Sequence, residues 1–317
     1  MKRIIILIIS ISLCLTGCGT AKKPYSASGF CFDTIITCNF YGKNAVKAAK
    51  DCMALGNHYD DLWNKNKPDS EIYKLNHSLG NHVKVSDETV EVLKLAVDIA
   101  KRSNGMVTPL IGSLSSLWNF KDESPSLPLE EDIKEALKHT DYTNIHISGT
   151  EVWISDPEAK LDLGFIAKGY AADKMKELAL KDGVTSGYIN LGGNVLTIGS
   201  KPGNADFNIG IRDPSSEASS LFSVPIRDLS VVTSGVYERC FTIDDTLYFH
   251  ILDTKTGYPV RNNLLSVSVI GPSSAMCDAL STTLFVMGYD TGVAFLKDFP
   301  DYKAIFITDD GEILKTY

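Results

Sequence analysis

A carboxylate and a hydroxyl stand four residues apart in an apolar stretch near the C-terminus. Asp278 and Thr282 lie within Met-Cys-Asp-Ala-Leu-Ser-Thr-Thr-Leu-Phe, residues 276–285, which has a helical pattern. Because residues i and i+4 share one face of a helix, both side chains can present oxygen atoms to one cation. Hard oxygen ligands suit Mg²⁺, which keeps further positions for phosphate oxygens and water. Taken alone, the pair also fits a capping carboxylate and a hydroxyl bonded to a backbone carbonyl.

A second carboxylate precedes a glycine turn and an expected helix start. Residues 161–173 read Leu-Asp-Leu-Gly-Phe-Ile-Ala-Lys-Gly-Tyr-Ala-Ala-Asp, so that Asp162 ends a strand that turns through Gly164. The following helix is expected to begin near Gly169. A helix start attracts anions through its free N–H groups and its dipole, and Lys168 adds a positive charge there. The alternative is that both glycines serve only a tight turn and close helix packing.

A histidine stands in a short apolar stretch farther along the chain. His250 is flanked by Phe249, Ile251 and Leu252, and Asp253 follows where the expected strand ends in a turn. A neutral imidazole near pH 7 can take a proton from a hydroxyl nucleophile, which makes His250 the best acid–base candidate. The alternative is a packed, hydrogen-bonded histidine in a strand.

The elements that must position these side chains follow from apolar spacing and turn residues. Helical spacing predicts helices over 44–62, 86–103, 169–181 and 275–287, with a short helix inside 125–141. Helices and antiparallel-looking strands alternate without a regular βαβ pattern, which favours an α+β fold over a doubly wound sheet. Runs of β-branched and aromatic residues predict strands over 30–42, 146–155, 188–190, 195–198, 207–212, 221–225, 230–233, 248–252, 265–270, 304–307 and 313–316.

Five segments dense in Gly, Asp, Thr and His follow one another along the chain, at 161–173, 189–194, 233–239, 250–259 and 276–285. Together they resemble the ApbE-like family of FAD:protein FMN transferases, and the match runs from about Phe30 to the C-terminus. The resemblance implies a T-fold-related α+β domain of mixed helices and largely antiparallel sheets over residues 29–317. It also implies an enzyme that uses Mg²⁺ and takes FAD as its substrate.

The resemblance implies roles for individual residues. Asp278, Thr282 and the backbone carbonyl of Phe165 are expected to hold Mg²⁺, and His250 is expected to be catalytic. Asp162 is expected to contact the cofactor, with Lys168 near its phosphates. The full set of expected cofactor-binding residues is Phe32, Asn66, Met106, Val107, Thr108, Asp162, Lys168 and Leu252.

Four positions depart from the family pattern. Phe32-Asp33-Thr34 stands where relatives often show Met-Gly-Thr, and Phe32 keeps a large apolar side chain able to cover a flat ring. Thr108 replaces a carboxylate in the stretch that lines the flavin and adenine pocket. Phe165 stands where most relatives carry a small residue; a main-chain ligand tolerates that change, but the ring must point elsewhere. Asn66 stands where relatives often have Tyr, and it fits an exposed turn equally well.

The implied reaction transfers FMN from FAD to a Thr or Ser hydroxyl of an acceptor flavoprotein and releases AMP. Two alternatives stay open. One is a hydrolase in the same pocket, in which water replaces the acceptor and FAD yields FMN and AMP. The other is a non-catalytic flavin- or solute-binding lipoprotein, which needs neither metal ligands nor His250.

The N-terminus has the pattern of a secretory signal over residues 1–17. Lys2 and Arg3 are followed by an apolar run too short to cross a bilayer comfortably, and then by small residues. The ending Leu-Thr-Gly-Cys resembles a lipobox, which implies an acylated Cys18, a tether over 18–28 and anchoring on the extracytoplasmic face of the cell membrane. Two or three acyl chains give a stable anchor. The alternative is an ordinary signal peptide with an incidental cysteine.

Charge and cysteine content exclude some classes of protein. The formal charge is −8, and it becomes −10 if Lys2 and Arg3 leave with the signal. Such an acidic surface argues against a nucleic-acid partner, so an anionic substrate needs a local positive or metal-bearing site. Five cysteines follow Cys18 without a Cys-x-x-Cys pair or a His cluster, which predicts neither a zinc site nor a disulfide framework. Cys31 and Cys38 could bridge, or could be buried apolar residues.

Overall fold

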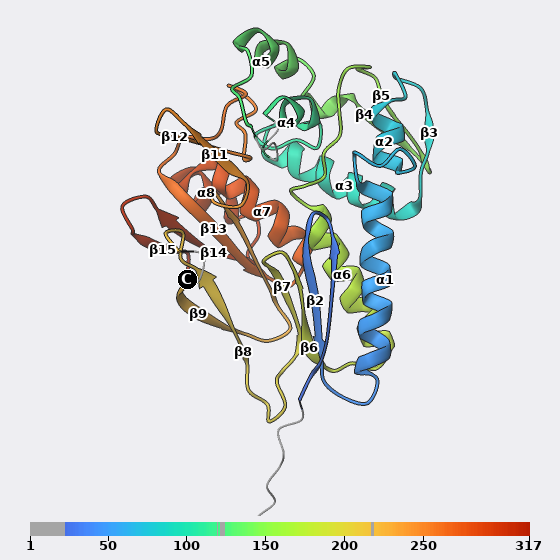
Figure 1. The fold of residues 1–317 in the computed structure, drawn as a ribbon, viewed down its shortest axis with the longest axis vertical. Helices are drawn as coiled ribbons and strands as arrows, with labels where there is room; N and C mark the ends of the chain where they lie inside the picture. The colour runs from blue at the N-terminus through green and yellow to red at the C-terminus, as the bar shows by residue number, and fades with distance from the viewer. Residues whose placement is uncertain (1–22, 119, 121–123, 217–218) are drawn as a thin grey trace, which may run out of the picture.

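The computed structural model describes residues 23–118, 120, 124–216 and 219–317. Its centre is an eight-stranded sheet in which every neighbouring pair of strands is antiparallel (Figure 1). The first strand of the chain lies at one edge of the sheet and the last strand at the other, and strands far apart in sequence pair inside the sheet. In spatial order the strands are β1 (Tyr25–Cys31), β2 (Thr34–Phe40), β6 (Ser186–Leu191), β7 (Asn194–Gly199), β10 (Ser230–Gly235), β13 (Leu264–Gly271), β14 (Lys303–Thr308) and β15 (Ile313–Lys315).

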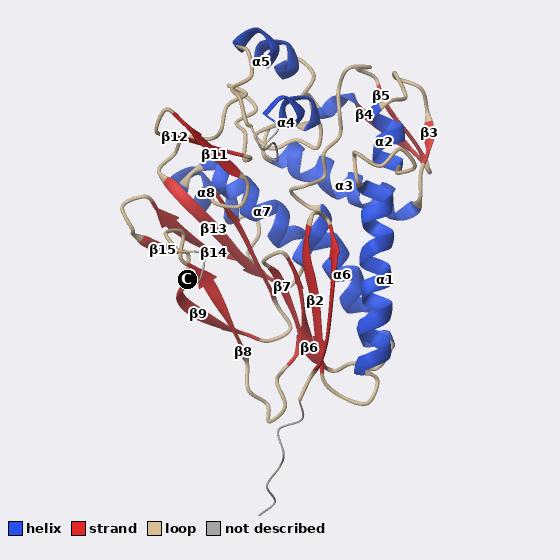
Figure 2. Ribbon diagram, in the orientation of Figure 1, coloured by secondary structure: helices blue, strands red, loops and turns tan. Residues whose placement is uncertain are grey.

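Helices cover one face of this sheet and a hairpin covers part of the other (Figure 2). The helix layer consists of α1 (Ala45–Trp63), α6 (Ala167–Lys181) and α7 (Ser274–Met287), with α8 (Tyr289–Leu296) packed on α7. The main apolar core lies between these helices and the sheet. On the opposite face, β8 (Phe207–Arg212) and β9 (Ser220–Ile226) close a smaller apolar cluster against β10, β13 and β14.

A group of smaller elements lies beyond the upper end of the sheet in Figure 1. Three short strands pair in the order β3-β5-β4, and β11 pairs with β12 as a hairpin. Of this group, α4, the loop before it and the segment after β12 line the cavity described below. The elements of the group are α2 (Glu71–Asn76), β3 (Val83–Lys84), α3 (Asp87–Arg102), α4 (Gly112–Trp118), α5 (Glu130–Leu137), a 3-10 turn (Tyr142–Asn144), β4 (Ile145–Ser148), β5 (Glu151–Ile154), β11 (Cys240–Ile243) and β12 (Thr246–Phe249).

Helices α6 and α7 hold each other's first turns through two carboxylates. Asp173 of α6 accepts hydrogen bonds from the backbone N–H groups of Ser274 (2.8 Å) and Ala275 (3.0 Å), at the start of α7. In return, Asp278 of α7 accepts one from the N–H of Gly169 (2.9 Å), at the start of α6. These are N–H groups that a helix cannot pair internally. A side chain at position 169 would overlap the Ser274 carbonyl, so only glycine allows this close approach.

The α+β class with mixed helices and largely antiparallel sheets, predicted from the sequence, is confirmed. The helices expected over 44–62, 86–103, 169–181 and 275–287 correspond to α1, α3, α6 and α7, and the segment expected as a hairpin strand over 146–155 forms the two strands β4 and β5. Helices α2, α4 and α8 were not predicted, because six to eight residues are too few to establish a helical period.

Two boundaries predicted from the sequence are wrong. The single strand expected over 30–42 is a hairpin, because the chain reverses at Phe32 and Asp33, which have φ values of 51° and 58°. Strand β1 begins at Tyr25, inside residues 18–28, the range expected for the tether. The strand expected over 248–252 ends at Phe249, so His250 lies just beyond β12.

The cysteines of the described chain are free thiols. Cys31, Cys38, Cys52 and Cys277 are buried and Cys240 is exposed. Cys31 and Cys38 are therefore buried apolar residues and are not bridged to each other. Residues 1–22, which hold the expected signal and Cys18, lie outside the described residues. Within the described ranges, no helix combines the length and the apolarity that crossing a bilayer requires.

Candidate active site

One cavity of about 530 Å³ gathers the side chains predicted for the site. It lies where the β1–β2 turn and the end of β10 meet the first turn of α6, the middle of α7 and the loops before α4 and after β12. Cys18, the predicted lipidation site, is outside the described residues. The other predicted site residues all line the cavity: Phe32, Asn66, Met106, Val107, Thr108, Asp162, Phe165, Lys168, His250, Leu252, Asp278 and Thr282.

Asp278 is a buried carboxylate with a backbone N–H beside one oxygen and a lysine near the other. Its side chain lies under the start of α6, and the residue is only 3% exposed. Oδ2 accepts the Gly169 N–H, and Oδ1 lies 3.8 Å from Nζ of Lys168. The N-terminus of its own helix is capped by Ser273, whose hydroxyl accepts the Met276 N–H. Asp278 therefore does not cap α7, and one of its oxygens is left for the cavity.

Two further residues expected to offer oxygen ligands, Thr282 and Phe165, line the same cavity as Asp278. Thr282 follows it by one turn of α7, and its Oγ1 lies 3.0 Å from Oγ of Ser234 in β10. The Phe165 carbonyl precedes α6. Helical geometry would pair it with the Gly169 N–H, which donates to Asp278 instead. The Phe165 ring packs partly buried against the main core, which accommodates the larger side chain. A carboxylate, a hydroxyl and a carbonyl form an oxygen donor set that fits Mg²⁺.

Asp162 is held as an ion at the cavity wall. Oδ2 accepts hydrogen bonds from Nζ of Lys65 (2.7 Å) and Oγ of Ser115 (3.0 Å), and Oδ1 accepts the Gly164 N–H (2.9 Å). Burial raises the pKa of Asp162, but the charge and hydrogen bonds of its partners outweigh burial and lower the pKa to about 2. The carboxylate is therefore a fixed, ionised acceptor at neutral pH.

The β1–β2 turn supplies the aromatic wall of the cavity. The Phe32 and Trp63 ring centroids lie 6.5 Å apart, and the Phe32 N–H donates to Oδ1 of Asp60 in α1 (3.1 Å). Oδ2 of Asp33 lies 3.8 Å from Nη2 of Arg239, and both residues line the cavity. Such contacts hold a turn whose two central residues have the positive φ that glycine and asparagine tolerate best. They place a large apolar ring at the cavity edge, as expected for Phe32.

Thr108 and Asn66 line the cavity, and the hydrogen bonds that they make go to neighbouring loop residues. The Thr108 hydroxyl donates to the carbonyl of Thr140 (2.9 Å) and accepts the Leu110 N–H (3.1 Å), so that it fixes its own loop. The Asn66 N–H donates to Oδ1 of Asn64 (3.0 Å) in an exposed turn at the cavity rim. Asn66 therefore stands in an exposed turn that also lines the cavity.

His250 faces the cavity from the segment after β12. Its backbone N–H donates to the Arg239 carbonyl (3.1 Å), and Nδ1 is buried without a hydrogen bond to any described residue. Burial, followed by the positive charges of Arg239 and Lys168, lowers the pKa of His250 to about 4. The imidazole is thus neutral at pH 7, which a proton acceptor requires. The Asp253 carboxylate accepts the Lys255 N–H in the next turn.

A model of the ApbE family matches residues 32–306, which is most of the chain. The chain belongs to the ApbE family. It is 33% identical to an FAD:protein FMN transferase of Treponema pallidum, over 95% of this chain and 90% of the relative. It is 34% identical to one of Klebsiella pneumoniae, over 92% of both chains. The crystal structure of an ApbE protein from Thermotoga maritima is 31% identical, with a TM-score of 0.87 over 92% of this chain and 97% of the other.

Several lining residues of this ApbE-family pocket were missed by sequence reasoning. Ser234 and Arg239 lie inside a segment that carries the family resemblance, and that context was the signal for them. Lys65 stands in a polar turn just after Trp63, the last residue of α1. A lysine there in an acidic chain is only a weak indication of an anion-binding site. Ser115 has no local signal, because only the fold brings α4 against Asp162.

The lowered pKa of His250 predicts an unusual pH profile for this ApbE-family chain. If His250 accepts a proton, kcat/KM should stay level as the pH falls through the ordinary histidine value of 6.5, and decline only near pH 4. Between pH 6.5 and pH 4, His250 binds a proton in the unfolded chain but not in the folded chain. The free energy of unfolding is therefore highest above pH 6.5 and decreases as the pH falls toward 4. Initial rates and thermal melts across this range test both effects. A rate profile with its midpoint near 6.5 would contradict the assignment.

Proposed function

We propose that this chain is an Mg²⁺-dependent FAD:protein FMN transferase that attaches FMN to a Thr or Ser hydroxyl of an acceptor flavoprotein and releases AMP. The observation that carries the proposal is one cavity in which the buried carboxylate of Asp278 and the neutral imidazole of His250 face the same space. The names of the relatives from Treponema pallidum and Klebsiella pneumoniae support the same activity.

In the proposed reaction, the acceptor hydroxyl oxygen forms a bond to the FMN-side phosphorus of FAD. The bond from that phosphorus to the bridging oxygen breaks, and AMP leaves with this oxygen. His250 takes the proton of the hydroxyl on its neutral imidazole. The acceptor ends as a phosphoester of FMN, and no oxidant or reductant is consumed.

The remaining residues of the cavity would bind and orient FAD. Asp278, Thr282 and the Phe165 carbonyl would hold Mg²⁺, which when bound neutralises charge on the pyrophosphate. Lys168 adds a positive charge at the first turn of α6, where helix N–H groups favour anions. Asp162 offers an ionised acceptor that suits an N–H or hydroxyl of FAD. Mg²⁺ and Lys168 would together supply the positive charge that a chain of net charge −8 otherwise lacks.

Co-expression with an acceptor flavoprotein tests the proposal. Membrane proteins from cells with and without this chain are separated on a denaturing gel and scanned for flavin fluorescence. We expect a fluorescent acceptor band only when the chain is present, and none when the acceptor hydroxyl residue is replaced by Ala. Free FMN and AMP without a labelled acceptor would instead identify an FAD hydrolase. FAD binding without any turnover would identify a non-catalytic flavin-binding lipoprotein.

We also propose that Cys18 anchors the chain to the extracytoplasmic face of the cell membrane, with bound FAD and acceptor outside the cytoplasm. Cys18→Ala should leave a soluble or uncleaved protein, because the acyl chains of a lipobox cysteine provide the anchor. The rate of FMN transfer by the purified domain should not change. Membrane fractionation and mass spectrometry of the N-terminus measure the effect, and a processed, acylated Cys18→Ala protein on membranes would rule the anchor out.

A further inference from the structure

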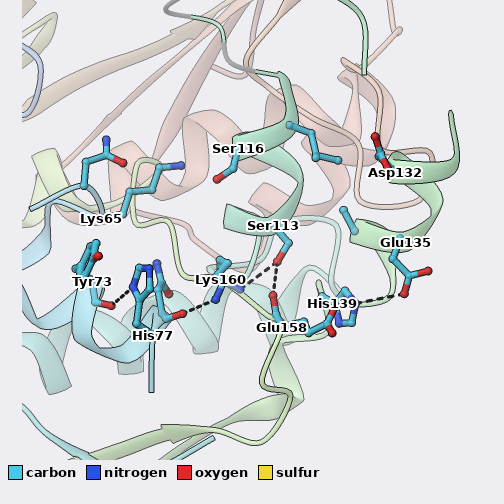
Figure 3. A pocket seen from close by; sticks show the side chains of 14 residues that line it. Lys65, Tyr73, His77, Ser113, Ser116, Asp132, Glu135, His139, Glu158 and Lys160 are labelled. Atoms are coloured by element: carbon cyan, nitrogen blue, oxygen red, sulfur yellow. Dashed lines mark hydrogen bonds and ion pairs between the residues drawn. The ribbon is translucent and has the colours of Figure 1, made fainter. Parts of the chain in front are cut away.

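A second cavity, of about 630 Å³, adjoins the active-site cavity and shares Lys65, Asn66 and Ser116 with it (Figure 3). Tyr73 and His77 lie at one end of this second cavity. At the other end Glu135, on α5, and His139, just after α5, lie close to Glu158, in the segment after β5 (Figure 3). One ligand atom from each of these three residues lies within 4.8 Å of the others.

The two ring nitrogens of His139 have different surroundings. Nδ1 lies 2.8 Å from Oδ2 of Asp156 in a hydrogen bond, and the side chain of His139 is only 16% exposed. Nε2 is buried and makes no hydrogen bond within the described residues. It lies 3.3 Å from Oε2 of Glu158 and 3.6 Å from Oε1 of Glu135. When the carboxylate of Asp156 holds the proton on Nδ1, the lone pair of Nε2 faces two further carboxylates.

A lone pair and two carboxylates facing one point repel one another unless a cation lies between them. Zn²⁺ binds imidazole nitrogen and carboxylate oxygen at about 2.0–2.2 Å with tetrahedral geometry, which places ligand atoms about 3.3–3.6 Å apart. The distances from Nε2 of His139 to Glu158 and Glu135 agree with this spacing. A carboxylate on the second ring nitrogen is also the usual arrangement around a metal-bound histidine.

We propose that Glu135, His139 and Glu158 form a second metal site, for Zn²⁺ or a similar divalent transition metal, in which Asp156 orients His139. Water completes the coordination, since the glutamate side chains are 58% and 69% exposed. Lys138 pairs with Oε2 of Glu135 at 2.7 Å and leaves Oε1 for the metal. This second site is separate from the expected Mg²⁺ ligands around Asp278, and it does not depend on the proposed transferase activity.

The position of this site connects it to the active-site wall. Glu158 lies four residues before Asp162, and its carbonyl accepts the hydroxyl of Ser113 in α4 (3.2 Å). Glu135 and His139 belong to α5 and the turn after it, which the site would join to the segment that carries Asp162. A metal bound here therefore cross-links the outer wall of the cavity, and we infer a stabilising role.

Zinc titration of the purified, metal-stripped chain in excess Mg²⁺ tests the site. We expect one Zn²⁺ per chain and a higher melting temperature with zinc. His139→Asn should abolish both effects, and Asp156→Asn should weaken zinc binding by about 10- to 100-fold, as loss of an orienting partner does. His77→Asn is the matched control, because His77 lines the same cavity but bonds the Tyr73 carbonyl through Nδ1. Its zinc affinity should equal that of the unmodified chain.

Two outcomes would overturn the proposal. One is zinc affinity that His139→Asn leaves unchanged while Asp278→Asn removes it, which would place the zinc in the active site. The other is no stoichiometric binding by a folded chain, which would mean that Glu135, His139 and Glu158 do not form a metal site. X-ray absorption at the zinc edge checks the ligand set independently, with one imidazole nitrogen and the remaining ligands oxygen. Melting curves without zinc show whether each variant is folded.

Discussion

Replacing Asp278 by Asn should lower FMN transfer by about 10²- to 10³-fold, the usual effect of removing one electrostatic contact to a reacting group. It should also raise the Mg²⁺ concentration needed for half-maximal rate. Asn has the same shape, and its amide oxygen can still accept the Gly169 N–H that Asp278 binds at 2.9 Å. The first turn of α6 therefore stays capped, and the change removes the charge alone. Initial rates over an Mg²⁺ titration measure the effect.

The reciprocal cap provides a matched control for this prediction. Asp173→Asn makes the same chemical change at the start of α7, outside the cavity lining. It should lower thermal stability and leave the Mg²⁺ dependence unchanged. Asp278→Ala is less informative, because an unpaired Gly169 N–H costs about 1–3 kcal/mol of stability in a buried position. Near-normal transfer by Asp278→Asn at low Mg²⁺ would remove Asp278 from the metal ligands.

The candidate site could be located from the sequence because its chemistry lies in short segments. Asp278 and Thr282 are one helical turn apart, and Asp162, Gly164 and Lys168 lie within seven residues around the start of α6, although the strand expected to end at Asp162 is not formed. In such segments local geometry follows from residue spacing. The α+β class could be predicted because helical and strand-like segments are mixed along the chain without a regular βαβ alternation.

Features that depend on distant contacts could not be predicted. The turn at Phe32 and Asp33 lacks the glycine or asparagine that usually marks a two-residue hairpin, because Asp60 and Arg239 hold it from other elements. The burial of Asp278 follows from Gly169, more than one hundred residues earlier in the chain. The carboxylate predicted as a metal ligand is therefore also part of the α6–α7 junction.

The second metal site illustrates the same limit. The sequence predicted no zinc site, because it has no Cys-x-x-Cys pair and no local cluster of histidines. Glu135 and His139 are four residues apart, but Glu158 and Asp156 come from the far side of the β4–β5 hairpin. A single His with scattered carboxylates is too common in sequences to indicate a metal. Only the fold places Nε2 of His139 between two carboxylates.

His250→Ala should reduce FMN transfer by about 10²- to 10⁴-fold, the usual contribution of a positioned acid–base group. His250 is the neutral imidazole of the cavity, held by a backbone hydrogen bond to Arg239 and by burial that lowers its pKa to about 4. FAD affinity should change little, because the pyrophosphate is expected to bind at Asp278 and the first turn of α6. A control, His146→Ala, alters a half-buried histidine of β4 that lies outside the cavity and should leave the rate unchanged.

Rate and affinity must be measured together, because His250 also packs against its surroundings. A fall in kcat with unchanged FAD dissociation constant and melting temperature identifies a group that acts only when the hydroxyl loses its proton. A parallel fall in FAD affinity and melting temperature would make His250 a packing residue and place the base elsewhere. The pH profile separates these cases again: loss of a base with a pKa near 4 removes the acid limb of the rate, whereas loss of packing leaves that limb in place.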